Sequence, residues 1–125
     1  MADTKFTRYA LRSVGTTAAD VPDGADFNTT DTLVGIHLTN ITSNAITVDV
    51  FLTTYNDDAD DDPSDNDKYY LIKGAPIASG GALQVLDGGA KMVVEDGDRL
   101  WVKSDTASSL DAWVSVVDDI SDALV

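Results

Sequence analysis

The chain of 125 residues has no cysteine, a single histidine and few basic side chains. The lack of cysteine excludes a disulfide framework, a cysteine-based zinc or iron–sulfur site and a thiol nucleophile. Eight lysines and arginines stand against 22 acidic residues, which gives a formal net charge of −14. A charge of this sign repels phosphate and offers no counterion release, so we expect no nucleic-acid partner.

Long hydrophobic runs are missing too. No apolar run approaches about 20 residues, and the first part of the chain has no apolar signal-peptide core, so we expect neither a membrane partner nor a secretory leader. The hydrophobic fraction of 43% can fill one core. The length suits one domain and not two, so we expect a single domain over residues 1–125.

The hydrophobic pattern repeats every two residues, as in half-buried strands. In the clearest run, Ile46, Val48, Val50 and Leu52 alternate with Thr47, Asp49, Phe51 and Thr53. A second row, Val34, Ile36 and Leu38, precedes the polar turn at 40–44.

Further strands are predicted at 69–73, 83–86, 91–94, 100–103 and 111–117, and residues 1–14 are predicted to form an arm or an edge strand. Glycine and aspartate mark the turns between them. The first of these strands is expected to end at Gly74. The pattern predicts an all-β fold, an antiparallel β-sandwich or jelly roll of about eight short strands.

An acidic loop over 56–67 holds seven aspartates within 11 residues. Two interpretations stay open. The loop is a mobile, solvated hairpin tip, or Asp58, Asp60 and Asp62 supply oxygen ligands for Ca²⁺. An EF-hand is not expected, because Pro63 stands where that motif needs glycine. No other metal or cofactor is predicted.

No constellation of catalytic residues is visible, so we expect no enzyme. His37, the one histidine, lies on the strand face opposite Ile36 and Leu38, and we assign it a structural role. Trp101 and Trp113 are both out of phase with their smaller apolar neighbours. Each tryptophan therefore belongs to a second core layer, a protein interface or a sugar-binding platform.

The second half of the chain contains turn-and-strand segments that are familiar from one group of proteins. These are Tyr70–Ile77 (YLIKGAPI), Lys91–Asp98 (KMVVEDGD) and Leu100–Ser104 (LWVKS), with Asn40–Val50 in the same style. The chain thereby resembles small β-sandwich virion structural proteins of tailed bacteriophages, especially marine and cyanobacterial phages. The first 30 residues and the acidic loop lie outside the resemblance.

The resemblance implies a virion structural protein without enzymatic activity, assembled in the host cytoplasm. The leading interpretation is a capsid decoration or cement protein that docks on the major capsid protein. It would be a homo-oligomer, with a trimer favoured. Two alternatives stay open, namely a tail, neck or fibre-base protein and a Ca²⁺- or carbohydrate-binding recognition module. The predicted contact residues are Lys5, Arg8, Tyr9, Leu11, Arg12, Trp101 and Trp113, because the N-terminal stretch is the one basic part of an acidic chain.

Overall fold

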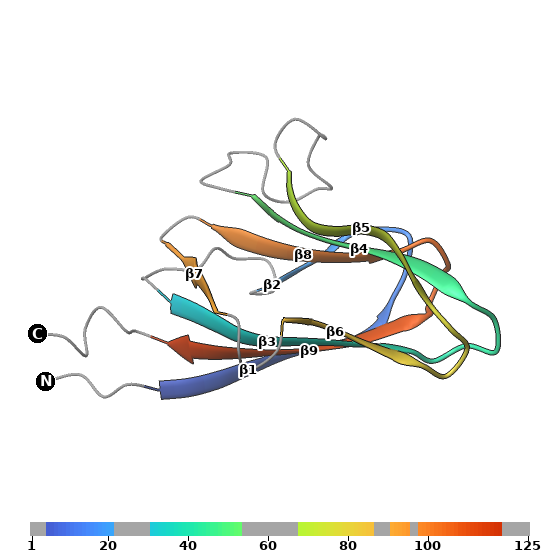
Figure 1. Ribbon diagram of the computed structural model, residues 1–125, viewed down its shortest axis with the longest axis horizontal. Helices are drawn as coiled ribbons and strands as arrows, with labels where there is room; N and C mark the ends of the chain where they lie inside the picture. Colours follow the sequence, from blue (N-terminus) through green and yellow to red (C-terminus); the bar gives the residue numbers. More distant parts are fainter. Residues whose placement is uncertain (1–4, 22–30, 54–67, 87–90, 96–97, 119–125) are drawn as a thin grey trace, which may run out of the picture.

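The computed structural model describes residues 5–21, 31–53, 68–86, 91–95 and 98–118, and these form nine strands (Figure 1). The strands are β1 Lys5–Val14, β2 Ala19–Val21, β3 Asp31–Asn40, β4 Ile46–Thr53, β5 Tyr69–Ile77, β6 Ala82–Leu86, β7 Met92–Val94, β8 Arg99–Ser104 and β9 Leu110–Asp118. The described residues contain no helix that is long and apolar enough to cross a membrane.

Two antiparallel sheets face each other (Figure 1). One has the order β1-β9-β3-β6, with β7 also paired to β3, and the other has the order β2-β8-β4-β5. This arrangement confirms the predicted antiparallel β-sandwich. Strand β2 was not predicted, because its three residues are too few to show a period. Residues 1–14 were predicted to form an arm or an edge strand, and β1 is an edge strand of its sheet.

The core fills the space between the two sheets. Both contribute alternate aliphatic side chains from their inner faces, as the period of two requires. The fully buried ones include Leu33, Ile36, Leu38, Val48, Val50, Leu100, Val102, Leu110 and Val114. Without disulfides, this layer of aliphatic contacts supplies most of the stability of the sandwich.

Two strand predictions were wrong in detail. In β3 the buried residue is Leu33 and not Val34, because a bulge between Leu33 and Gly35 shifts the phase by one position. Strand β5 does not end at Gly74 but runs on to Ile77. Gly74 has a positive φ of 64°, and its N–H donates to Asp49 Oδ1 at 2.7 Å. Strand β5 lies at the edge of its sheet and has only β4 as a neighbour among the described strands. Proline has no N–H to donate to a second strand, so Pro76 is tolerated at this edge position, where it pairs with β4.

One end of the sandwich is held together by buried polar contacts. Asn40 is fully buried, and its amide donates to the carbonyl oxygens of Asn44, Ile77 and Ala78 at 2.8–3.1 Å. Its own oxygen accepts from the N–H and the hydroxyl of Thr42. Asn40 therefore ties the turn after β3 to the end of β5.

At the same end, a carboxylate caps the start of β4. Asp105 Oδ1 accepts hydrogen bonds from the Thr47 N–H at 3.1 Å and the Thr106 hydroxyl at 2.9 Å. The bond from Thr47 and then that from Thr106 hold the pKa of Asp105 below its ordinary value. The charged form of Asp105 is therefore favoured in the folded chain.

Candidate functional site

The candidate site lies on the surface of the β1-β9-β3-β6 sheet that points away from the core. We call this surface the outer face. A row of facing side chains crosses it, in which Ala10 pairs with Trp113, Trp113 with His37, and His37 with Gln84. Their chain neighbours Ala112 and Leu38 point inward and are buried. Alternation therefore places Trp113 outward, and half of its surface (50%) is exposed.

A bulge in β1 builds a second row beside the first. The register shifts between Leu11 and Val14, so that Arg12 and Ser13 together stand opposite Asp111. Ser13 has a φ of 56°, and its N–H donates to Asp111 Oδ1 at 2.9 Å. Thr39 pairs with Asp111 from the other side. The bulge thus fixes Asp111 between Arg12 and Thr39.

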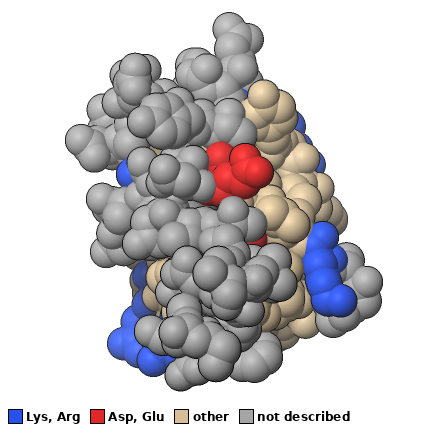
Figure 2. All heavy atoms as spheres, turned by 90° about the vertical axis from the view of Figure 1, so that its left-hand side faces the viewer, with Lys and Arg blue, Asp and Glu red and all other residues tan. Residues whose placement is uncertain are grey.

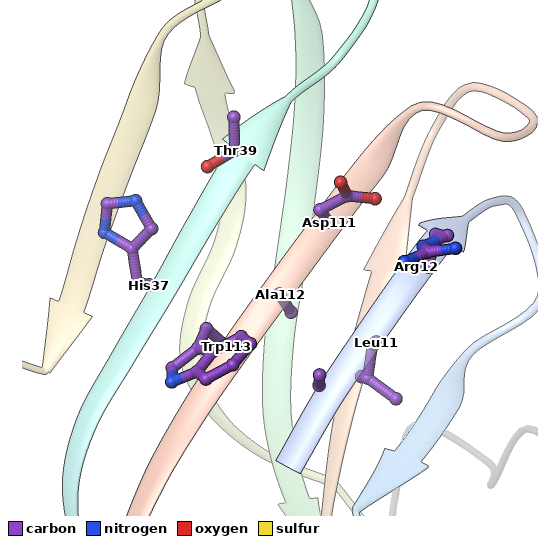
Figure 3. A pocket seen from close by; sticks show the side chains of 8 residues that line it. Leu11, Arg12, His37, Thr39, Asp111, Ala112 and Trp113 are labelled. Carbon is purple, nitrogen blue, oxygen red and sulfur yellow. The ribbon is translucent and has the colours of Figure 1, made fainter. Parts of the chain in front are cut away.

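A shallow groove of about 630 Å³ runs between the two rows (Figure 3). Trp113 and His37 stand on one side, and Arg12, Asp111 and Thr39 stand on the other (Figure 3). The groove is lined by Ala10, Leu11, Arg12, His37, Thr39, Asp111, Ala112 and Trp113. It therefore combines an aromatic wall with a row of hydrogen-bonding and charged groups.

Two arginines give the outer face its positive charge. The guanidinium carbon of Arg8 lies 5.1 Å from the centre of the Trp113 ring, in a cation–π contact. Within the described ranges, neither Arg8 nor Arg12 forms an ion pair. Arg99 differs from both, because it is buried and pairs with Asp20 at 2.9 Å. Arg8 and Arg12 thus differ from Arg99 in having no ion-pair partner among the described residues.

The groove brings the imidazole of His37 to the same surface as the Thr39 hydroxyl and the Asp111 carboxylate, and these groups suit the binding of a partner. His37 Nδ1 lies 2.5 Å from Gln84 Oε1, so the ring is oriented by an amide and not by a carboxylate. Among the described residues, no group of three or more histidine, aspartate or glutamate side chains is placed to hold a metal ion. The calcium ligands predicted from sequence, Asp58, Asp60 and Asp62, lie outside the described residues.

The outer face gathers some of the predicted contact residues and excludes others. Arg8, Arg12 and Trp113 lie together on it. Alternation along β1 turns the side chains of Tyr9 and Leu11 toward the core, where both are partly buried, so their role as contact residues stays a prediction. Leu11 is also among the residues that line the groove. Of Lys5, the structure describes the backbone, which pairs with Asp118.

The prediction of Trp101 as a contact residue needs a correction. It is only 3% exposed and stacks on Phe51 with a centroid distance of 6.1 Å. Its indole Nε1–H donates to the Thr53 hydroxyl at 3.0 Å. Trp101 therefore belongs to the second core layer, which was one of its three predicted roles, and it is not a surface contact. The sequence also failed to single out Thr39 and Asp111, because only the cross-strand register brings them to Arg12 and Trp113.

The charge of the chain is divided unevenly. All eight lysines and arginines lie in the described ranges, together with eight of the 22 acidic residues. The sandwich is therefore close to neutral, and the other 14 acidic residues account for the net charge of −14. All of these except Asp87 fall in the segments 1–4, 22–30, 54–67, 96–97 and 119–125.

These five segments join the described strands at one end of the sandwich. Lys5 pairs with Asp118, and Asp31 with Val94, at the end of the first sheet. In the second sheet Thr53 pairs with Arg99, and the contact of Glu95 with Asp98 links the two sheets there. Figure 2 shows this end of the molecule, with lysine and arginine side chains around the margin of the view. We call it the acidic end.

Comparison with known proteins shows a likeness of fold. No protein-family model matches the chain, and no curated protein matches it. Among solved structures, the chain is similar to Drosophila NLP-core, with a TM-score of 0.50 and 12% identity over 94% of this chain and 98% of that one. The crystal structure of NLP-core provides insight into pentamer formation and histone binding by that protein. At this identity the likeness shows the sandwich fold alone.

Proposed function

We propose that this chain is a structural protein without enzymatic activity, a capsid decoration or cement protein of a tailed phage, which acts by contact with protein neighbours through its outer face. The observation that carries the proposal is the half-exposed Trp113, covered on one side by Arg8 and close to Arg12, which forms no ion pair with the described residues. Tryptophan and arginine are the residues most enriched where protein partners bind tightly.

Three further observations support an assembly role. The sequence resembles phage virion proteins over its second half. NLP-core, which has a similar sandwich, belongs to a protein that forms pentamers, so this fold is compatible with close packing of several copies. The groove is lined by residues of three neighbouring strands of one sheet, β1, β9 and β3, as suits a protein contact and not a sequestered reaction.

The location and copy number of the chain in purified particles test the proposal. We expect cryo-electron microscopy to place it at symmetry axes of the head, in hundreds of copies per particle. About three to twelve copies, confined to a symmetric tail or neck ring, would instead establish the alternative of a tail, neck or fibre-base protein. Absence from the particle would refute both.

A binding experiment examines the outer face directly. Particles that lack the protein are incubated with wild type, with Arg8→Glu/Arg12→Glu, or with Lys73→Glu/Lys91→Glu, and bound protein is counted after sedimentation. The two double variants carry the same net charge, but only the first changes the groove and the residue over Trp113. We expect the first to bind at least about tenfold more weakly than the second. Equal binding of both variants would contradict the proposed contact.

A thermal scan separates the remaining alternative, a Ca²⁺-dependent recognition module. The decoration proposal expects the same Tm with Ca²⁺ and with EDTA. A bound ion at a hundredfold excess over its dissociation constant adds about 2.7 kcal/mol, which raises Tm by several degrees. Such a rise, lost in Asp58→Asn/Asp60→Asn/Asp62→Asn, would favour calcium binding by the acidic loop.

A further inference from the structure

We propose that the edge of β1 binds an extended acidic segment of the neighbouring protein, which pairs with β1 and lengthens the β1-β9-β3-β6 sheet by one strand. This inference rests on the proposed function, because it names how the protein neighbour is held beside the outer face. It goes further by assigning the contact to backbone groups of β1 and by fixing the alternation of side chains that the partner strand needs.

The regularity of β1 is the first argument. Strand β1 has β9 as its one neighbour among the described strands (Figure 1). Its register with β9 is regular from Lys5, opposite Asp118, to Leu11, opposite Ala112, and the bulge comes only after Leu11. In an antiparallel sheet, every second residue of an edge strand directs its N–H and C=O away from the sheet. Strand β1 therefore presents a regular row of backbone donors and acceptors to a further strand.

The other edges of the described sandwich are protected against such pairing. Strands β2 and β7 have three residues each, and β6 has five. Strand β5 is longer, but it contains Pro76 and a Gly74 with positive φ, and its register with β4 shifts twice. Short strands, proline and irregular register all hinder the pairing of a sheet edge with another chain. Among the described edges, β1 with its ten residues is the long one that lacks proline.

The inner side chains of β1 predict apolar residues on one side of the added strand. Tyr9 and Leu11 pack against the core but are only partly buried. Their partners on β9, Val114 and Ala112, are buried, because β9 has a neighbouring strand on each side. Apolar side chains on the inner face of an added strand would cover Tyr9 and Leu11 in the same way.

The outer side chains predict acidic residues on its other side. Strand β1 contains Lys5, Arg8 and Arg12 and no acidic residue. The guanidinium of Arg8 lies over the ring of Trp113 on β9, at 5.1 Å, so it leans away from the edge and leaves the backbone accessible. Opposite charges that face each other on neighbouring strands attract, and like charges repel. A second β1 would bring only basic residues to this edge, so an acidic strand of another protein is the favoured partner.

A short synthetic peptide with this alternation is the probe. Its sequence is Glu-Val-Glu-Val-Glu-Val-Glu with blocked ends, which places all valines on one face of a strand and all glutamates on the other. One control peptide has lysine in place of each glutamate. A second control has prolines in place of the central valine and the glutamate after it, which removes an N–H on each edge of the peptide strand.

Three full-length proteins are titrated with each peptide at about 0.15 M salt, where long-range repulsion is screened. They are wild type, Arg8→Glu/Arg12→Glu and Lys73→Glu/Lys91→Glu. The two double variants have equal net charge, and neither Lys73 nor Lys91 lies in β1. Nuclear magnetic resonance measures the affinity and the hydrogen exchange of each amide, and circular dichroism verifies that every variant is folded.

We expect the glutamate peptide to bind wild type and the Lys73/Lys91 variant with a Kd below about 100 µM. It should slow the exchange of every second amide within residues 5–11, because only the outward N–H groups gain a partner. Both control peptides should bind wild type at least about tenfold more weakly, and so should the glutamate peptide with the Arg8/Arg12 variant. That variant should instead bind the lysine peptide more tightly than wild type does.

Three results would overturn the inference. The first is no binding of the glutamate peptide at about 1 mM. The second is binding that shifts the Trp113 indole resonance without slowing any amide of β1, which would show docking on the outer face alone. The third is slow exchange of consecutive β1 amides in the protein without peptide, which would show that the chain itself or a second copy already covers this edge.

Failure of this inference and failure of the proposed function give different results. A chain that is present on the virion head but does not pair with the peptide would overturn strand addition and leave the decoration function standing. A chain that pairs with the peptide but is absent from virions would do the reverse.

Discussion

The two tryptophans provide a sharp test of the structure, because the sequence treats them alike and the fold does not. Trp101 is 3% exposed and Trp113 is 50% exposed. A tryptophan as buried as Trp101 removes about 200 Å² from water, which is about 5 kcal/mol at 25 cal/mol/Å² as an upper value. Allowing for residual burial in the unfolded chain, we expect Trp101→Ala to cost about 4 kcal/mol.

The cost at Trp113 is expected to be far smaller. The side chain covers no core residue, and its replacement by alanine removes a cation–π contact with Arg8 that is worth about 0.5–1 kcal/mol. The entropy of unfolding scales with chain length, so these losses correspond to Tm shifts of about 15 °C for Trp101→Ala and about 2–4 °C for Trp113→Ala. The two variants thus differ by a margin that standard methods resolve.

Urea unfolding followed by far-UV circular dichroism measures both losses without relying on tryptophan fluorescence. Protein at about 2 µM limits any contribution from self-association to the free energy of unfolding. Trp101→Phe serves as a control, since it keeps the ring stacked on Phe51 but leaves the buried Thr53 hydroxyl without its donor. The assignment of the two layers would be refuted if Trp113→Ala were as costly as Trp101→Ala.

Three other expectations follow from the described contacts. Asn40→Ala should lower the free energy of unfolding in urea by about 3 kcal/mol, because it leaves buried backbone groups without hydrogen-bond partners. Asn44→Ala, at an exposed position, should lower it by less than about 0.5 kcal/mol. Equal losses would contradict the hydrogen-bond network of Asn40. The lowered pKa of Asp105 adds stability that is present above the unfolded value of about 3.9 and is lost as pH falls through the folded value, so wild type and Asp105→Asn should differ at pH 7 and converge at pH 2. A gap that persists at pH 2 would argue against this linkage. Asp20→Ala should lower the free energy of unfolding by about 3 kcal/mol, because Arg99 stays buried but loses the Asp20 carboxylate. Adding Arg99→Met to this variant should restore part of the lost stability. If it restores none, the stability does not depend on the Arg99–Asp20 pair.

Much of the fold could be predicted from the sequence, because a half-buried strand shows as a local alternation of apolar and polar residues. The alternation of Ile46, Val48 and Val50 follows from backbone geometry, since successive side chains leave opposite faces of a strand. The same rule placed His37 and Trp113 outward, and both are exposed. The net charge and the missing cysteine are likewise properties of the chain at any conformation.

Other features were decided only by tertiary packing. Side-chain alternation points both Trp101 and Trp113 away from the inner core. Phe51, which is distant in the sequence, stacks on Trp101 and helps to bury it. Trp113 stays half exposed among the described residues. Bulges in β1 and β3 shifted the phase of both strands, which no local period reveals.

The outer face itself exists only in three dimensions. Arg12 and Asp111 are separated by most of the chain, and they meet because β1, β9 and β3 pair in one particular register. The same pairing brings the start of β1, the start of β3 and the end of β9 together, and the described strands adjoin the acidic segments 1–4, 22–30 and 119–125 at these points. Side-chain alternation is a local property of the backbone, and the sequence by itself determined it. Register, layer cover and the separation of charge depend on contacts between distant strands, so only the tertiary structure decided them.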